Sequence, residues 1–569
     1  MTQRSVNAVG TVTRGREHVD ISSTNAPIRG YWEPDGTELR TGSDAIRSAL
    51  FRLHEPVFMV RAETGIGVGE GGRAVLGNGV DVPADGYPLL AHAPALPAEN
   101  LGDPGFRRRH GLRFAYIAGA MANGITSVRM VTAMARAGMI GFFGAAGLSP
   151  DAVEAAVVDL KSGLGDRPFG VNLIHSPNDP ALESAVVDRY LKHEIRTVSA
   201  SAYLDLTPML IRYRLHGIRR QPDGRVVCPN QVVAKVSRVE VARRFLSPPP
   251  EKFVAELRRT GAVTAEEAAL AGEVPVASDL TAEADSGGHT DNRPALALLP
   301  TLMALRDQLC DQYGYVERPA VGLAGGIATP AATAAAFAMG AAFVLTGSIN
   351  QACVEAGTSA AVREMLAEAG QADVTMAPAA DMFEMGVRVQ VLKRGTMFPQ
   401  RAARLHDLYR TYSAFSEIPE SDRRTVERDF LKKSFEDAWA ETRAFFQRRD
   451  PRQVERADRD PRHRMALVFR SYLGLSSRWA VEGVADRRID YQIWCGPAIG
   501  AFNEWVRGSF LAPAESRDVV TVARNLLAGA AVATRAASIR NQGLSIPAEA
   551  ERFHPLPGPE LERMMRTDV

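Results

Sequence analysis

Between about residues 112 and 350, short apolar runs alternate with longer stretches that have helical spacing. Runs that are apolar throughout, separated by helices, are typical of a parallel sheet buried on both faces. Eight such units over about 240 residues match the size of a (β/α)8 barrel, with a doubly wound open sheet as the alternative. The eight predicted strands are 114–118, 139–143, 170–174, 197–200, 231–235, 280–283, 320–323 and 343–346.

The fold class is therefore α/β, and we place the barrel at residues 106–400. Before it, the apolar run Val57–Val60 and the glycine-rich stretch 65–79 indicate a small β-rich N-terminal domain over residues 1–105.

After the barrel, residues 401–569 indicate a mainly helical C-terminal region packed on the barrel. Within it, residues 424–448 and 523–537 have the spacing of amphipathic helices. The charged stretch 448–464 between them predicts an exposed loop.

The composition narrows the function classes. Lysine and arginine number 67 and aspartate and glutamate 66, so the formal net charge is +1 and offers no field for nucleic acid or an anionic membrane. The 4 cysteines form no CxxC pair, so we expect no metal site and a reducing compartment. Met1–Asn25 is polar and no run of about 18 apolar residues occurs, so we expect a cytoplasmic protein without a membrane span.

Glycines follow the last two predicted strands. Gly325 and Gly326 come after the seventh strand, and Gly347 and Ser348 come after the eighth. Backbone N–H groups at such positions approach an anion closely, and the loops after strands seven and eight of a barrel often bind phosphate. The pattern predicts a phosphate site, with tight turns that bind no ligand as the alternative.

A histidine follows two glycines after the sixth predicted strand, in Gly287-Gly288-His289. An imidazole titrates near neutral pH and can transfer protons. Because barrel active sites lie at the carboxyl ends of the strands, we favour His289 as a catalytic residue over a histidine that only bonds within its loop. His175 and Tyr203, just beyond strands three and four, are weaker candidates.

Other strand ends suit a flat heterocycle. Gly119-Ala120-Met121 after the first strand leaves room for a ring against the backbone. Asn172 in the third strand can donate and accept hydrogen bonds, as a ring with alternating C=O and N–H groups requires. Lys235 interrupts an apolar strand and could stabilise a reduced anionic ring, unless it simply reaches solvent.

These residues occur in the order found in the superfamily of nitronate monooxygenases and FMN-dependent enoyl reductases, which the barrel portion resembles. The chain resembles still more closely the PfaD-type trans-acting enoyl reductases of polyunsaturated fatty acid synthases and trans-acyltransferase polyketide synthases, over nearly its whole length. The matching segments are Phe169–Pro180 (FGVNLIHSPNDP), Glu283–Pro294 (EADSGGHTDNRP), Gln390–Phe398 (QVLKRGTMF), Met465–Ala480 (MALVFRSYLGLSSRWA) and Tyr491–Trp505 (YQIWCGPAIGAFNEW).

The resemblance implies a bound FMN. Position 120 is commonly proline in the monooxygenases, so Ala120 is a small departure, and either Glu283 or Asp285 could be the acidic partner of the flavin. The implied contacts are Gly119, Ala120, Met121, Asn172, Lys235, Gly287, Gly288, Gly325, Gly326, Gly347 and Ser348.

The resemblance also implies a reaction: NADPH-dependent reduction of the 2,3-double bond of an enoyl thioester carried by an acyl carrier protein. A nitronate monooxygenase-like flavin oxidase and a non-catalytic scaffold are the alternatives. Two arginine clusters, Arg107–Arg109 and Arg212–Arg220, could receive an acidic carrier protein. The pathway, the substrate chain length, the stereochemistry and the preference for NADPH over NADH stay open, as does a homodimer. The 492–505 segment either packs on the barrel or covers its active-site end.

Overall fold

The computed structural model describes residues 26–63, 65–176 and 180–566. Met1–Asn25, from which we inferred the absence of a leader, and residues 177–179 of the segment Phe169–Pro180 lie outside these described residues. The chain forms two compact units. Of the described residues, one unit contains those from 26 to 96 together with Val532–Arg552, and the other contains Pro97–Ala531 together with residues 553–566.

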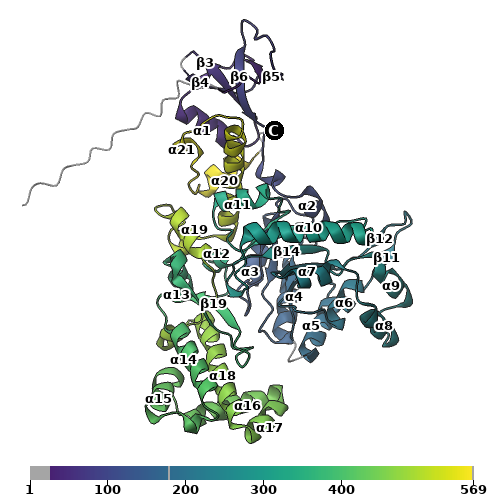
Figure 1. Ribbon diagram of the computed structural model, residues 1–569, viewed down its shortest axis with the longest axis vertical. Coiled ribbons are helices and arrows are strands. Elements are labelled where there is room, and N and C mark those ends of the chain that lie inside the picture. The colour runs from purple at the N-terminus through teal and green to yellow at the C-terminus, as the bar shows by residue number, and fades with distance from the viewer. Residues whose placement is uncertain (1–25, 64, 177–179, 567–569) are drawn as a thin grey trace, which may run out of the picture. The chain divides into compact units, whose positions relative to one another are not determined.

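The larger unit contains a closed barrel of eight parallel strands, and all eight predicted strands are confirmed (Figure 1). The strands follow one another around the barrel in chain order, and the last pairs with the first through Thr346 and Ala118. The strands are β7 (Tyr116–Ala118), β8 (Ile140–Phe143), β9 (Gly170–Ile174), β10 (Thr197–Ser201), β13 (Gln231–Val236), β14 (Asp279–Glu283), β16 (Ala320–Ala324) and β17 (Val344–Thr346).

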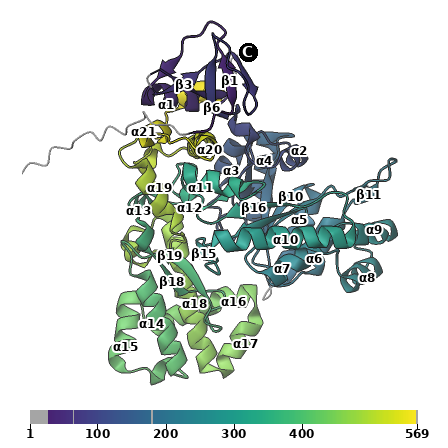
Figure 2. The same ribbon diagram turned by 45° about the horizontal axis from the view of Figure 1, so that its top comes forward.

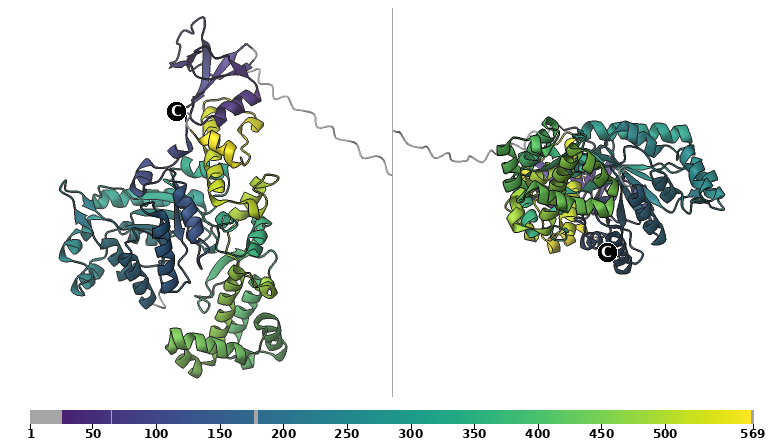
Figure 3. Two further views of the ribbon diagram at one scale, coloured as in Figure 1. Left: turned by 180° about the vertical axis from the view of Figure 1, so that it is seen from behind. Right: turned by 90° about the horizontal axis from the view of Figure 1, so that it is seen from below.

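Helices follow the strands and surround the barrel in the blue and teal region of Figure 3. Several begin at a serine or threonine whose side chain accepts a backbone N–H of the first turn, as Ser127 does from Met130 and Thr329 from Ala332. The main helices are α3 (Val128–Arg136), α4 (Pro150–Leu164), α5 (Pro180–Lys192), α6 (Pro208–Leu215), α7 (Val239–Leu246), α10 (Ala295–Tyr313), α11 (Pro330–Ala338) and α12 (Ser348–Gln351).

A buried histidine–aspartate hydrogen bond lies at the amino-terminal end of the barrel. His110 of α2 (Pro104–His110) lies 2.7 Å from Asp279 at the start of β14, and Asp279 also accepts the N–H of Ala320 at 3.0 Å. Both side chains of the pair are almost completely inaccessible to solvent. The neighbouring α2 arginine, Arg109, lies 3.5 Å from the same carboxylate. These buried contacts stabilise the amino-terminal end of the barrel, which is opposite the end where the strands finish.

After the barrel, a three-stranded antiparallel sheet joins the barrel loops to the helical region. It contains β15 (Gly288–His289), β19 (Arg388–Leu392) and β18 (Val374–Pro378) in that order. Figure 2 shows β18 and β19 beside helices α14 (Phe398–Thr411) and α18 (Pro461–Glu482). The shared core of these elements includes Val389, Phe398 and Phe469.

The helical C-terminal region is confirmed, but the exposed loop predicted at 448–464 is wrong. Helix α16 (Phe435–Arg449) leads almost directly into α17 (Pro451–Arg459), and α18 follows at Pro461. Each of the last two helices has an aspartate at the N-cap and a proline at the first position, which is a helix-start signal. Val454 and Ala457 face the core while the charges face solvent, so the charge density concealed a short helix.

The smaller unit is β-rich, as predicted, with a six-stranded antiparallel sheet in the order β2-β4-β3-β6-β1-β5. Its helices are α1 (Ser43–Phe51), α21 (Ala548–Glu551) and the end of α20 (Val519–Arg540) from Val532 onward. Its strands are β1 (Gly30–Glu33), β2 (Arg40–Thr41), β3 (Val57–Ala62), β4 (Gly65–Gly69), β5 (Arg73–Leu76) and β6 (Tyr87–Ala93).

Within the described parts of the chain, no helix combines the length and the apolar character needed to cross a bilayer.

Candidate active site

The two predicted phosphate loops lie side by side at the carboxyl end of the barrel. Strands β16 and β17 are hydrogen-bonded neighbours, so Gly325-Gly326 and Gly347-Ser348 leave the same edge. Gly325 has φ +86°, and a Cβ there would lie 2.7 Å from the backbone of Ala284 and Asp285, so only glycine fits. A Cβ on Gly326 or Gly347 would meet nothing within 4 Å. These two glycines thus border open space.

Inside the barrel, the polar side chains gather on one side. Cα partners in a parallel sheet point the same way, and the register aligns Asn172 with Ser199, and Lys235 with Thr281. On the other side, Gly322, Ala324, Leu345 and Ile117 are small or apolar. The carboxyl end of the barrel therefore has one polar and one apolar half.

Two buried atoms of the polar half have no partner among the described residues. The Oδ1 atom of Asn172 and the Oγ1 atom of Thr281 are shielded from solvent and make no hydrogen bond there. A buried polar atom without a partner costs about 1–3 kcal/mol, so such atoms point to a group that binds there. Asn172 Oδ1 is suited to a ligand N–H, because a side-chain amide oxygen is an acceptor.

Lys235 is paired with Glu283 across β13 and β14. Its Nζ lies 2.8 Å from Glu283 Oε1, and Glu283 also accepts the hydroxyl of Ser286 at 2.9 Å. Asp285 instead accepts amide N–H groups from Asn292 at 2.7 Å and Gln390 at 2.8 Å. Of the two acidic residues that the sequence left open, Glu283 is therefore the one that neutralises the lysine.

The Gly119–Met121 turn is held by a residue that the sequence pattern did not reveal. The hydroxyl of Thr126 donates to Gly119 O at 2.7 Å and accepts the N–H of Met121 at 2.9 Å. Thr126 is completely buried. The turn thereby keeps its small residues, including Ala120, beside the end of β17, where Gly119 N–H donates to Thr346 O at 2.9 Å.

His289 lies on β15, paired with Val389 of β19. The next β19 residue, Gln390, donates to Ser286 O at 2.8 Å and to Asp285, so this strand fixes the loop that carries the histidine. The His289 side chain is 29% exposed, and its Nε2 lies 3.2 Å from Asp381 Oδ2. The imidazole is thus partly open to solvent and held by a carboxylate.

The segment Trp494–Gly496 covers the glycines next to His289. A Cβ on Gly287 would lie 2.6 Å from the Cα of Cys495, and a Cβ on Gly288 would lie 3.0 Å from the Trp494 ring. The N–H of Gly496 donates to Ser348 Oγ at 2.9 Å. The C-terminal region therefore packs on the barrel loops of the candidate site, as the packing alternative for the 492–505 segment predicts.

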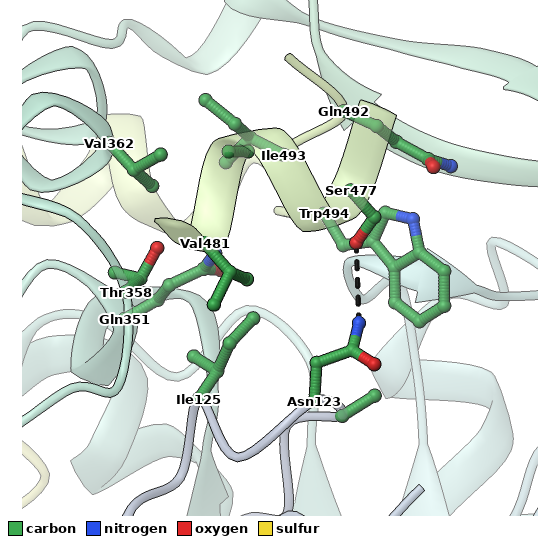
Figure 4. Close-up of a pocket in the computed structure, with 12 residues that line it drawn as sticks. Asn123, Ile125, Gln351, Thr358, Val362, Ser477, Val481, Gln492, Ile493 and Trp494 are labelled. Carbon is green, nitrogen blue, oxygen red and sulfur yellow. Dashed lines mark hydrogen bonds between the residues drawn. The ribbon is translucent and has the colours of Figure 1, made fainter. Parts of the chain in front are cut away.

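A narrow pocket adjoins Trp494 (Figure 4). It lies between the loop after β7 and helix α18, and Asn123 Nδ2 donates to Ser477 Oγ at 3.3 Å across it. Its volume of about 10 Å³ is room for one water molecule, far too little for a flat cofactor. Its lining is Ala122, Asn123, Ile125, Gln351, Thr358, Val362, Ser477, Ala480, Val481, Gln492, Ile493 and Trp494.

His175 and Tyr203 stack on each other after β9 and β10, with ring centroids 5.1 Å apart. The Tyr203 hydroxyl donates to Glu183 Oε1 at 2.9 Å, and burial raises the pKa of this phenol well above its ordinary value. Tyr203 is therefore a buried packing residue with a satisfied hydroxyl, which leaves His289 as the stronger candidate.

Comparison with known proteins identifies the family. The family model described as nitronate monooxygenase matches residues 110–411, which is more than half of the 569 residues. The chain belongs to the nitronate monooxygenase family. Two further models match outside the barrel: the N-terminal domain of the fatty acid synthase protein PfaD at residues 32–95, and the inserted helical domain of [acyl-carrier-protein] S-malonyltransferase at residues 412–491.

Within this family the chain is of the PfaD type. The crystal structure of the enoyl reductase domain of MlnA from Bacillus amyloliquefaciens is similar with a TM-score of 0.74 and 38% identity, over 78% of this chain and 99% of that chain.

Two curated relatives are larger. A polyunsaturated fatty acid synthase component of Thraustochytrium is 45% identical over 78% of this chain, and polyketide biosynthesis protein PksE of Bacillus subtilis is 43% identical over 77%. The chain spans 30% and 57% of their lengths, respectively.

In this family member, the arginines that we expected to receive a carrier protein lie away from the candidate site. Arg107–Arg109 belong to α2 at the amino-terminal end of the barrel, and Arg219 and Arg220 lie in the hairpin that leads into the start of β13. Arg214 is buried and donates to the carbonyls of Pro275 and Asn230. Both clusters therefore lie toward the end of the barrel opposite the candidate site, and docking of a carrier protein on them stays a prediction.

Proposed function

We propose that this protein is an FMN-dependent enoyl reductase that uses NADPH to reduce the 2,3-double bond of enoyl thioesters carried by an acyl carrier protein. The observation that carries the proposal is that the glycine loops after the neighbouring strands β16 and β17 leave the carboxyl end of the barrel, where the loop of His289 follows β14. The enoyl reductase domain of MlnA, to which the chain is similar over most of its length, supports the same reaction.

The residues present fit a flavin mononucleotide. Open space next to Gly326 and Gly347 would admit the phosphate to their backbone N–H groups. The unpartnered Asn172 Oδ1 would accept an N–H of the pyrimidine edge, and Lys235 would face that edge with its charge. The remaining contacts in this proposal come from backbone at Gly119, Ala120, Met121, Gly287, Gly288, Gly325 and Ser348.

The cofactor supplies hydride chemistry: a hydride from NADPH is delivered to the β-carbon of the substrate double bond. The residues of the chain would orient the substrate, stabilise the negative charge of the enolate and supply the proton. Electrons of the double bond move to the thioester oxygen, where nearby backbone N–H groups would stabilise the enolate. His289 would then give a proton to the α-carbon, which completes reduction to the saturated thioester.

The carrier protein is supported as a partner by the relatives, which belong to polyketide and polyunsaturated fatty acid biosynthesis. The substrate's thioester arm would enter at the carboxyl end of the barrel, since His289 and both glycine loops lie there. We place the docking surface at this end, away from the arginine clusters at the opposite end.

The test is a flavin spectrum followed by an anaerobic assay. We expect the purified chain to bind FMN and to oxidise more than one equivalent of NADPH only when a crotonyl carrier thioester is added, with butyryl thioester as product. Oxidation of NADPH that needs oxygen and ignores the thioester would indicate the oxidase alternative. A colourless chain that takes up no FMN would indicate a scaffold.

The role of His289 has its own prediction. In FMN-loaded His289→Ala, turnover of the crotonyl thioester should fall about 100-fold, the range for loss of a general acid. Flavin content should be unchanged, because the imidazole is not needed to hold the phosphate. Full turnover by this variant would remove His289 from the mechanism.

A further inference from the structure

Two groups from outside the barrel hold the imidazole of His289. Asp381, in the turn between β18 and β19, places Oδ2 3.2 Å from Nε2. Trp494 meets the imidazole edge to face, with centroids 5.9 Å apart and planes at 77°. Both reach the histidine because β15 pairs with β19, and β19 in turn bridges to Trp494 through Val391. The ring is therefore constrained from two sides.

The carboxylate determines which imidazole nitrogen carries the proton. A neutral imidazole has one N–H, on either nitrogen, and a carboxylate can only accept. Burial alone would raise the pKa of Asp381, but its hydrogen bond with His289 lowers that pKa below the ordinary value. Asp381 is thus ionised at neutral pH, so Nε2 must be the donor in this pair and Nδ1 is the nitrogen left free.

We propose that Asp381 is a positioning residue that fixes the tautomer and orientation of His289, so that Nδ1 is the atom that delivers the proton to the substrate. The proposal rests on the proposed reductase function for its catalytic consequence. When Nδ1–H gives its proton to the α-carbon, the imidazole becomes neutral with Nε2–H still bonded to Asp381. Solvent then returns one proton to Nδ1.

The Asp381–His289 pair is too exposed to contribute much to the stability of the fold. The side chain of Asp381 is 60% exposed and that of His289 29%, and exposed pairs contribute at most about 1 kcal/mol to stability. By contrast, the histidine–carboxylate pair His110–Asp279 is fully buried at the amino-terminal end of the barrel. Loss of Asp381 should therefore leave the fold intact and change how His289 works.

The kinetic test uses the FMN-loaded full chain and a crotonyl carrier thioester. Asp381→Asn should lower kcat about 10- to 100-fold, because an amide can present either its N–H or its oxygen to Nε2 and no longer selects a tautomer. KM should stay within about threefold, flavin content should not change, and Asp381→Glu should recover most of kcat.

The matched control is Glu384→Gln in the same turn. Glu384 pairs with Arg470 at 3.1 Å and does not contact His289. We expect its kcat within about twofold of wild type. An equal loss in both variants would assign the effect to the turn as a whole and overturn the proposal, as would unchanged kcat in Asp381→Asn.

A second readout does not depend on turnover. In protein labelled with ¹⁵N-histidine, the His289 signals are those lost in His289→Ala. We expect the neutral ring to carry its proton on Nε2 in wild type and on both nitrogens, in exchange, in Asp381→Asn. A proton on Nδ1 in wild type would overturn the proposal. If the tautomer is as expected but the wild-type chain reduces no enoyl thioester, the proposed reductase function is contradicted, whereas the proposal that Asp381 fixes the tautomer is still supported.

Discussion

At the scale of single residues, the glycines at the strand ends are required for different reasons. Gly325 is enclosed, because a Cβ would collide with the backbone of Ala284 and Asp285, so it is needed for the fold. Gly347 has φ −132°, outside the left-handed region, and a Cβ there would meet nothing. A side chain at Gly347 would therefore be harmful only if the proposed FMN phosphate occupies that space.

We therefore expect Gly347→Ala to fold normally and bind FMN poorly. Its unfolding temperature without FMN should stay within about 3 °C of wild type. Its Kd for FMN, measured by fluorescence quenching, should rise at least about tenfold, which corresponds to about 1.4 kcal/mol. Gly163→Ala, on the exposed face of α4 with nothing within 4 Å, is the control and should bind FMN as wild type does. Equal affinity in both variants would remove Gly347 from the cofactor site.

At the scale of elements, helix α20 begins at two carboxyl groups that accept backbone N–H groups near its start. Glu355 accepts the N–H of Val519 at 3.1 Å, and Asp518 accepts the N–H of Thr521 at 2.7 Å. Burial and the neighbouring Asp518 raise the pKa of Glu355 far above the ordinary value of 4.5. The hydrogen bond from Glu355 helps lower the pKa of Asp518, against its burial. The proton therefore resides on Glu355.

This pair predicts a pH-dependent stability. A carboxyl group whose pKa is raised by folding stabilises the protein below its unfolded pKa, and that stabilisation is lost as pH rises through the folded pKa. The unfolding temperature should thus fall between about pH 5 and 8. Glu355→Gln, which mimics the protonated group, should flatten this fall. Glu482→Gln, which breaks the exposed pair with Arg478, should not. A wild-type slope in Glu355→Gln would contradict the assignment.

At the scale of the whole molecule, two segments far apart in the sequence meet within the smaller unit. Arg535 is almost fully buried, and its guanidinium donates to the carbonyls of Leu50, Arg52 and Glu55 at 2.6–2.8 Å. These carbonyls lie at and just after the end of helix α1. A single side chain thus connects residues separated by more than 400 positions.

We expect Arg535→Met to destabilise the smaller unit while leaving the barrel functional. Unpaired buried carbonyls should cost about 2–4 kcal/mol. Hydrogen exchange should therefore accelerate in residues 30–93 and 532–552, with FMN affinity unchanged. Arg540→Ala in the same helix loses only an exposed pair with Glu551 and should show little effect. Protection lost equally across the barrel would mean that the two units unfold together.

The sequence by itself determined the features that depend on the local pattern of residues. Apolar runs of strand length, separated by helical spacing, placed all eight barrel strands, because each strand is buried on both faces. Parallel strands with right-handed connections end at one edge, so the glycine turns after β16 and β17 had to be neighbours. The local sequence also contains helix-start signals at Pro451 and Pro461, but the density of charge led us to predict a loop there.

Only the tertiary structure decided how distant segments complete the site. The loop of His289 is contacted by Asp381 and Gln390, which reach it because β15 pairs with β19, about 100 residues later in the chain. It is also contacted by Trp494, about 200 residues later in the chain. Their neighbouring residues carry no local signal for those partners, because such contacts form only when packing brings the elements together. The arginine clusters could be recognised in the sequence. The end of the barrel at which they lie could not, because it depends on how the elements pack.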